Sequence, residues 1–199
     1  DRWRYTSSQA SKFTCQQNAG AVTPPADFSY YMGFTVASAV TVGTNDYFAI
    51  EQRVEGYNAA HLNLGTANAQ ASKLSFWVRS SLTGTFGGAI RGAGFARSHP
   101  FNYTISSANT WEKKTVTIAG DTTGTYNTTN GTSIGVLFSL GAGSGKSGTA
   151  GAWTGSDLMS ATSAVSVVGT GSATWYVTGV QLEVGDTATE FEHRSYGDE

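Results

Sequence analysis

The side chains best suited to binding chemistry lie on the polar sides of segments that alternate in polarity. Trp77 and Arg79 share one such side, and Glu51 and Arg53 share another. An indole plane can stack on the C–H face of a sugar ring while flanking guanidinium and carboxylate groups hydrogen-bond its hydroxyls. If the fold brings the two segments together, these four residues form one carbohydrate-binding patch. The alternative is that Trp77, like Trp175, fills the core or a subunit interface.

Glu51 and Glu55 are the carboxylates whose spacing could provide a general acid and a base. They are four residues apart on one extended segment, so their Cα atoms should lie roughly 13 Å apart at ~3.3 Å per residue. That separation exceeds the ~6.5–9.5 Å between the carboxyl groups of inverting glycosidases. Arg53 lies between them on the same side. We therefore expect a self-neutralising Glu–Arg–Glu ladder on a solvated or subunit-facing surface, and we assign no catalytic residue.

Two loop aromatics, Tyr126 and Trp153, are further candidates for stacking on sugars. Glu183 and Asp186 could supply oxygen ligands to a structural calcium ion, but no ligand loop accompanies them, and ordinary surface charge is the favoured interpretation. The three histidines are far apart in the sequence, and none has a neighbour at zinc-ligand spacing. The sequence therefore predicts no metal site and no cofactor.

The sequence matches neither of two enzymatic motifs in full. The segment 140–147 (LGAGSGKS) is similar to a phosphate-binding loop, but Leu140 stands where that motif requires glycine. The residues that follow are poor helix formers, so no helix N-terminus would meet a phosphate. No serine lies in the strand, Gly-x-Ser-x-Gly and helix context of a hydrolase. We expect a flexible surface loop at 141–155.

The elements that must position these residues are strands, because the apolar period is two. Phe48 and Ile50 alternate with charged residues, and Leu74, Phe76 and Val78 do the same. Gly-rich and Thr-rich turns separate the strand candidates, and one helical turn is expected near 57–64. The expected strands cover 3–6, 28–42, 47–55, 73–80, 86–91, 101–105, 111–118, 134–140, 165–168 and 174–184.

About ten strands in one domain predict an all-β fold, an antiparallel β-sandwich of jelly-roll type. We expect this module to span residues 1–187, with its first and last strands pairing. Residues 188–199 are richer in charge and are expected to form a C-terminal exit segment that reaches another part of a larger protein. A chain of this length is sufficient for one sizeable core.

Composition excludes several functional classes. Gly, Thr and Ser supply 74 of 199 residues, charged residues only 13%, and the net charge is −2. Without a basic excess, binding to a nucleic-acid backbone is not expected. The apolar runs are too short for a transmembrane helix, and no signal peptide is visible, so we expect no membrane insertion. Cys15 is the single cysteine and is expected to be a free structural thiol.

Three segments together resemble a jelly-roll module of bacteriophage tail-fibre and other virion appendage proteins. They are 74–80 (LSFWVRS), 111–125 (WEKKTVTIAGDTTGT) and 177–194 (VTGVQLEVGDTATEFEHR), and the opening 1–5 (DRWRY) fits the start of such modules. Segment 176–183 (YVTGVQLE) is also distantly similar to the last strand of carbohydrate-binding modules. Ser195 stands where related sequences often have proline, and 141–170 matches no related segment.

The resemblance implies a non-enzymatic structural protein of the phage virion. Such a tail-fibre or receptor-binding module would engage bacterial surface glycans, with other virion proteins as partners and a homotrimer as the expected assembly. One alternative is a capsid decoration or head-fibre domain whose polar faces serve subunit packing. A second is a polysaccharide depolymerase using Glu51 or Asp121 as an acid, which ranks last because depolymerising spikes usually carry a repetitive β-helix and this chain has no repeat.

Overall fold

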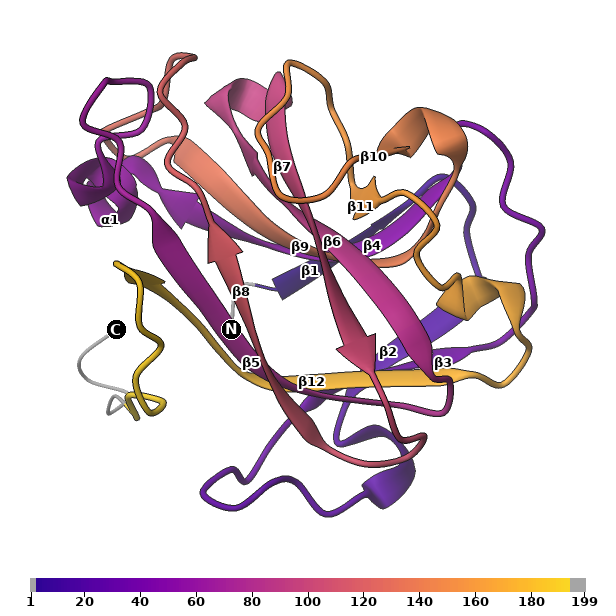
Figure 1. The fold of residues 1–199 in the computed structure, drawn as a ribbon. Coiled ribbons are helices and arrows are strands. Elements are labelled where there is room, and N and C mark those ends of the chain that lie inside the picture. Colours follow the sequence, from indigo (N-terminus) through magenta and orange to yellow (C-terminus); the bar gives the residue numbers. More distant parts are fainter. Residues whose placement is uncertain (1–2, 194–199) are drawn as a thin grey trace.

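A computed structural model describes residues 3–193 and shows two antiparallel sheets packed face to face (Figure 1). Sheet A has the order β1 (Trp3–Ser7), β4 (Tyr47–Glu55), β9 (Thr132–Ala142), β6 (Gly84–Gly92) and β7 (Arg97–Ile105). Sheet B has the order β2 (Phe13–Gln17), β3 (Met32–Val36), β12 (Thr174–Val184), β5 (Ser72–Ser80) and β8 (Glu112–Ile118). This confirms the predicted all-β sandwich of jelly-roll type.

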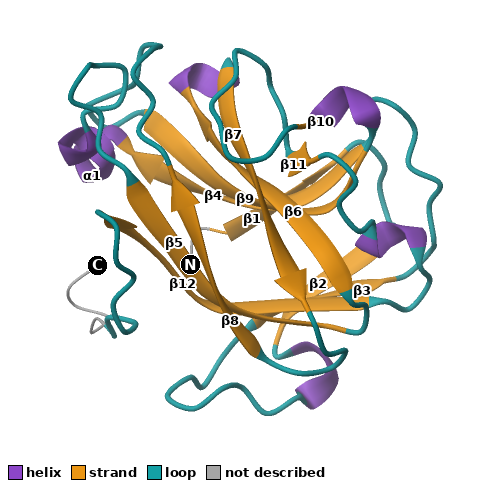
Figure 2. Ribbon diagram, viewed as in Figure 1, coloured by secondary structure: helices purple, strands orange, loops and turns teal. Residues whose placement is uncertain are grey.

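Short helical turns connect the strands, as Figure 2 shows. The α-helix α1 (Gly56–Ala59) continues into a 3-10 turn, which confirms the helical turn expected near 57–64. A parallel two-residue pair, β10 (Ser147–Gly148) with β11 (Ser160–Ala161), lies outside both sheets. The 3-10 turns are η1 (Ala19–Ala21), η2 (Ala60–Leu62), η3 (Ala93–Phe95), η4 (Ser144–Lys146) and η5 (Val167–Gly169).

The core lies between the sheets and is built by the alternation read from the sequence. Phe48 and Ile50 of β4 point inward from sheet A, and Leu74, Phe76 and Val78 of β5 point inward from sheet B, all fully buried. Burying large apolar side chains contributes about 1.5–3 kcal/mol each relative to exposure. The inward residues of the two sheets therefore hold the sandwich together, and the outward residues face either the solvent or the segments that cover the sheets.

Three expectations about the elements were wrong in detail. Residues 165–168 contain no strand, because Val167 and Val168 are buried in the 3-10 turn η5. The expected strand 28–42 is limited to β3, since Pro24 and Pro25 introduce a loop that continues to Tyr31. Strand β2 was not predicted, because its exposed run of Thr, Cys and Gln gives no apolar alternation.

The first and last strands of the sandwich do not pair with each other, contrary to expectation. Strand β1 pairs with β4 in sheet A, whereas β12 lies between β3 and β5 in sheet B. Residues after β12 turn back along sheet B, beside β12 and β5 (Figure 1). Residues 188–193 of the expected exit segment therefore contact the sandwich, and residues 194–199 lie outside the described part.

The outer faces of the two sheets differ in how much of each is covered. The segment between β9 and β12, which carries β10 and β11, lies over sheet A, where Met159 packs on Ala49 and Leu137. In the described part of the chain, the outer face of sheet B carries the loop before β3 and the C-terminal segment. Within residues 3–193, no helix is long and apolar enough to span a membrane.

Candidate functional site

The main candidate site is a pocket of about 510 Å³ on the outer face of sheet B, which we call the Trp77 pocket. Trp77 lies opposite Lys113 on β8, so outward side chains of the adjacent strands β5 and β8 form its floor, with Gly179 of β12 at its edge. Its indole is partly exposed, as the outward side of β5 requires. The pocket is lined by Ala26, Asp27, Phe28, Ser75, Trp77, Lys113, Gly179, Glu190, Phe191 and His193.

Two segments far apart in sequence make the walls of the Trp77 pocket. Phe28, from the loop before β3, lies 5.1 Å from the Phe191 ring and 5.3 Å from the His193 ring, measured between centroids. Gly179 adopts a φ of +58°, and a Cβ there would lie 2.5 Å from the Phe28 ring. Glycine is required at this position both for its backbone conformation and for the seating of Phe28.

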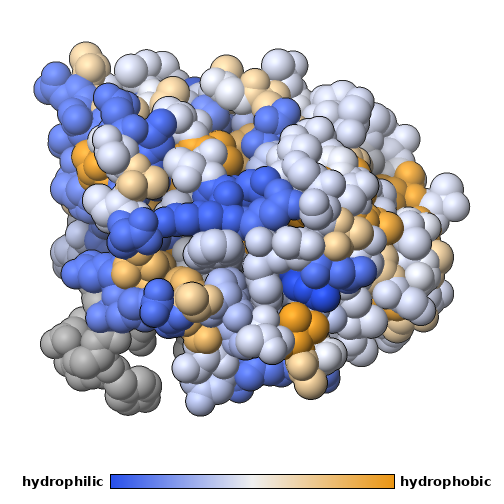
Figure 3. Space-filling view, turned by 60° about the horizontal axis from the view of Figure 1, so that its bottom comes forward, coloured by the Kyte–Doolittle hydropathy of each residue, from blue (hydrophilic) through white to orange (hydrophobic). Residues whose placement is uncertain are grey.

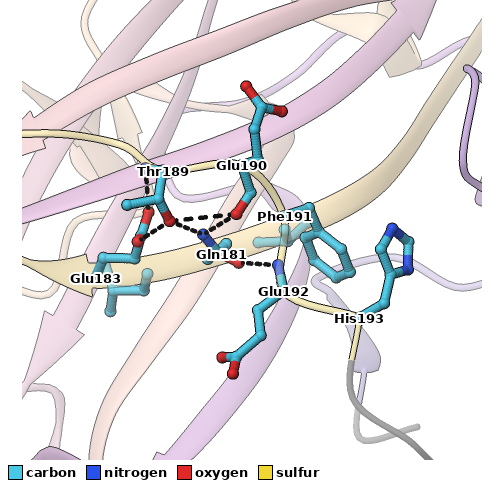
Figure 4. A pocket seen from close by; sticks show the side chains of 9 residues that line it. Gln181, Glu183, Thr189, Glu190, Phe191, Glu192 and His193 are labelled. Atoms are coloured by element: carbon cyan, nitrogen blue, oxygen red, sulfur yellow. Dashed lines mark hydrogen bonds between the residues drawn. The ribbon is translucent and has the colours of Figure 1, made fainter.

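The C-terminal wall is held on β12 by side chains that bond its backbone (Figure 4). Gln181 accepts a hydrogen bond from the Glu192 amide and donates one to the Glu190 carbonyl. Glu183 accepts hydrogen bonds from both the amide and the hydroxyl of Thr189. The Glu190 carboxylate pairs with Lys113 at 3.1 Å and places an anion beside a cation at the rim of the pocket.

Glu183 is therefore engaged within the chain rather than arranged for calcium. Hydrogen bonds from Thr189, with a smaller one from Gln181, lower the pKa of Glu183. Asp186, its expected companion, is exposed in the turn that follows. Among the described residues, no three His, Cys, Asp or Glu side chains are grouped to hold a metal ion.

Arg79 shares the outer face of sheet B with Trp77 but lies outside the pocket. Its guanidinium carbon is 5.6 Å from the Tyr176 ring centre, and its Nε donates to the Asn109 carbonyl at 3.0 Å. Tyr176 packs in turn against Tyr31 and Trp111. These contacts place Arg79 against a neighbouring aromatic cluster.

Glu51 and Arg53 lie on the outer face of sheet A, so the expected single patch with Trp77 and Arg79 was wrong. Strands β4 and β5 belong to different sheets, and their outward residues face opposite sides of the sandwich. Glu51 is also fully buried rather than solvated. It accepts hydrogen bonds from Arg4 at 2.8 Å, Arg91 at 2.9 Å and Arg53 at 3.3 Å.

Phe95 helps two of the three arginines, Arg53 and Arg91, to gather beside Glu51. Its ring centre lies 4.1 Å from the Arg91 guanidinium carbon and 4.7 Å from that of Arg53. Asp157 accepts a second hydrogen bond set from Arg91. A cation over an aromatic face is attracted by the ring quadrupole, which orients both side chains. This cluster ties β1, β4 and β6 to the covering segment and is a structural network.

The two loop aromatics proposed as sugar-stacking residues, Tyr126 and Trp153, lie against each other and do not present open ring faces. Their ring centres are 6.2 Å apart, edge to face, and both rings are partly buried. The Tyr126 hydroxyl donates to Asp121 at 2.5 Å, and the Trp153 Nε1 donates to the Ala119 carbonyl. Their polar groups are therefore occupied within the chain.

Asp121 and Arg97 complete this cluster as an ion pair with a bidentate set of hydrogen bonds. Burial alone would raise the pKa of Asp121, but hydrogen bonds from Arg97, Tyr126 and Thr123 hold it below its ordinary value. The Asp157 carboxyl is similar: burial would raise its pKa, but hydrogen bonds and ion pairs with Arg91 and Lys146 lower it overall. Both are anions that lock loops to the sheet.

His99 lies beneath Trp153 and is buried, with its ring centre 5.6 Å from that of Trp153. Neither ring nitrogen has a hydrogen-bond partner among the described residues. Burial lowers the pKa of His99, and nearby backbone groups and Asp121 offset this only in part. The folded protein therefore holds this imidazole in its neutral form.

We expect His99 to make the folded state less stable as the pH falls. The unfolded chain binds a proton on this imidazole below about pH 6.5, whereas the lowered pKa makes the folded chain bind it less readily, so stability is lost as the pH falls below that value. Urea unfolding of the parent and His99→Phe between about pH 7 and pH 5 should show a smaller decline for the variant. Identical declines would contradict this assignment.

Proteins similar to this chain are found among solved structures. No protein-family profile matches it, and no curated protein matches its sequence. A tailspike from bacteriophage CBA120, described as its enzymatically active domain, aligns at 12% identity over 92% of this chain and 19% of that one, with a TM-score of 0.48. This chain thus spans about one fifth of the length of that tailspike chain.

Two carbohydrate-binding modules are similar over most of both chains. TmCBM61, solved with β-1,4-galactotriose, has 11% identity over 92% of this chain and 88% of that one, with a TM-score of 0.48. A family 11 module from Clostridium thermocellum, solved with a mixed-linked tetrasaccharide, has 13% identity over 96% and 91%, with a TM-score of 0.42.

Sequence reasoning found the floor of the Trp77 pocket but missed its walls. Trp77 was identified from its outward position, whereas Asp27 and Phe28 lie in a loop that was expected to be partly strand. Phe191 and His193 were noticed only as part of a resembling segment. Because they flank Glu192, an extended chain places both rings on the same side. This spacing was the feature of the sequence that could have predicted an aromatic wall.

Proposed function

We propose that this protein is a non-enzymatic carbohydrate-binding module of a phage virion appendage that engages bacterial surface glycans through the Trp77 pocket. The observation that carries the proposal is the half-exposed indole on the floor of a pocket with polar groups at its rim. Lys113 can donate to sugar hydroxyls, and Asp27 and Glu190 can accept from them. The Phe191 and His193 rings add apolar walls.

The chemistry of this pocket suits a sugar better than a fully apolar ligand. A sugar presents one C–H face, which an indole covers, and a ring of hydroxyls, which charged and hydroxyl side chains bond. Figure 3, turned so that the lower edge of Figure 1 comes forward, shows a mostly hydrophilic surface with small, separated hydrophobic patches. Such a surface fits shallow contact with a hydrated polymer.

The charged groups support binding without turnover. A general acid for glycosidic cleavage needs a carboxyl group whose pKa is raised. Each described carboxylate with a displaced pKa is displaced downward: Asp46, Glu112, Asp121, Asp157 and Glu183. Glu51 and Asp121, the acids a depolymerase would use, are held by arginines.

The virion assignment rests on the segments that resemble phage appendage modules. In that setting, several copies on one fibre, as in a homotrimer, and many fibres on one particle make weak single-site binding effective. A capsid decoration domain with a packing role would instead need no glycan contact at the Trp77 pocket. Glycan binding therefore separates the two functions.

We expect Trp77→Ala to weaken binding to bacterial envelope polysaccharide by about tenfold or more, which corresponds to ~1.4 kcal/mol. The loss follows from removal of the stacking surface, and Trp77→Phe should retain part of the affinity. Binding would be measured on a glycan array and then by calorimetry, with the melting temperature confirming that each variant is folded.

Tyr57→Ala is the matched control, because Tyr57 is 67% exposed and lies on α1, outside the Trp77 pocket. It should bind as the parent does. If the parent binds glycan and Trp77→Ala binds equally well, the Trp77 pocket is not the site. If the parent binds no envelope glycan, the packing role is favoured.

A further inference from the structure

Two glutamines occupy inward-facing positions where the strand pattern calls for apolar residues. On β4, Gln52 continues the buried series of Phe48 and Ile50, and it pairs with Trp3 and Val136. On β2, Gln17 continues the side of Phe13 and pairs with Met32. Directly paired residues point to the same face of a sheet, so both side chains lie on the inner side of their sheets, Gln52 partly buried and Gln17 exposed.

These amides line a second pocket of about 650 Å³ at the mouth of the sandwich, which we call the glutamine pocket. Among the residues that the structure describes, no charged residue lines it. The side chains of Gln16, Gln17 and Gln52 make no hydrogen bond to any residue in the described part of the chain. Its polar and aromatic lining includes Trp3, Gln16, Gln17, Tyr30, Gln52 and Thr178.

The glutamine pocket adjoins the Trp77 pocket. Both are lined by Gly179 and Phe191, so one side of the Phe191 segment faces each of them. Strand β12 changes register between Thr178 and Gln181, where it passes between the two pockets. A linear ligand can therefore contact both pockets by crossing β12 at this irregularity.

We propose that the glutamine pocket is a second subsite that binds an uncharged sugar unit of the glycan chain held in the Trp77 pocket. A carboxamide both donates and accepts hydrogen bonds, which matches a hydroxyl, and Trp3 and Tyr30 supply aromatic surface. The Trp77 pocket differs because Lys113, Asp27 and Glu190 line it. The inference rests on the proposed function, and it makes the ligand an extended polysaccharide chain rather than a terminal sugar.

A purely structural role would not favour glutamine at these positions. Leucine has a similar size; at the partly buried Gln52 it would add apolar contact and leave no polar group to desolvate, and at the exposed Gln17 it should change stability little. The variant Gln17→Leu/Gln52→Leu should therefore melt at the same temperature as the parent or higher. Loss of binding in this variant would then reflect the site and not the fold.

The experiment measures affinity against oligosaccharide length. The probe is a labelled series, from monosaccharide to hexasaccharide, of the neutral glycan that the parent binds best on an array. The parent should gain about tenfold or more in affinity once the chain spans both subsites. Gln17→Leu/Gln52→Leu should lose that gain and keep the parent's affinity for the shortest ligand, whereas Trp77→Ala should bind every length more weakly.

Gln70→Leu is the matched control, because Gln70 is an exposed glutamine that lines neither pocket. The subsite is overturned if the double variant retains the full gain with length, or if the parent shows no gain. In either case, weakened binding by Trp77→Ala would leave the proposed function standing. If the parent binds no glycan on the array, both the proposed function and the subsite are overturned.

Discussion

Replacing Glu51 with glutamine is expected to lower the free energy of unfolding by about 3–5 kcal/mol. The Glu51 carboxylate is fully buried and is the shared partner of Arg4, Arg53 and Arg91. Most of the cost should come from Arg91, whose side chain is only 6% exposed, because it loses its fully buried anionic partner and keeps only the ion pair with the partly exposed Asp157. Arg4 and Arg53 are partly solvated and contribute less.

Urea unfolding of the parent and Glu51→Gln would measure this loss. Glu55→Gln is the matched control on the same strand, since Glu55 is exposed, and it should change stability by less than about 0.5 kcal/mol. If the loss for Glu51→Gln is no larger than for the control, the ion pairs of Glu51 with the three arginines do not stabilise the fold. If Glu51→Gln remains folded and glycan binding persists, a catalytic or binding role for Glu51 loses its support.

Replacing Asp121 with asparagine is expected to cost about 2–4 kcal/mol. Asp121 is 2% exposed and accepts hydrogen bonds from Arg97, Tyr126 and Thr123, so the substitution leaves the Arg97 cation unpaired. Tyr126 is seated close against Gly92, where no side chain would fit, so the loop has little room to adjust. The loop from Asp121 to Gly131 should loosen together with Tyr126 and Trp153.

The pH dependence of this loss follows from the pKa of Asp121. In the folded state that pKa is lowered, so its contribution to stability is fully present above the unfolded value of about 3.9. The contribution is lost as the pH falls from there through the folded pKa. Unfolding curves for the parent and Asp121→Asn should therefore differ most near neutral pH and converge in acid. A constant difference at every pH would contradict the ion-pair assignment.

Much of the fold could be predicted from residue order. The bounds of β4 and β12 match those expected, and Trp77 and Arg79 point outward as the alternation requires. Strand β2 and the 3-10 turn η5 were missed because edge strands and buried turns carry no clean period of two. The floor of the candidate site was therefore predictable, but its extent was not.

The walls of the Trp77 pocket depend on contacts that no local pattern encodes. Phe28 and Phe191 are far apart in sequence, and only the folding of both segments onto sheet B brings their rings together. Gln52 is visible in the sequence as a polar residue within an inward-facing apolar series. That it lines a pocket could not be predicted, because the pocket also needs a residue from another strand. That residue, Gln17, lies on the unpredicted strand.

The sequence by itself determined that the chain is an all-β sandwich and which side of most strands is buried, because alternation is a property of neighbouring residues. Only the tertiary structure decided which strands share a sheet, because strand pairing is non-local and a sandwich has two outer faces. That choice separated Glu51 and Arg53 from Trp77. It buried Glu51 among arginines and left Trp77 on the outer face of sheet B as the candidate glycan site.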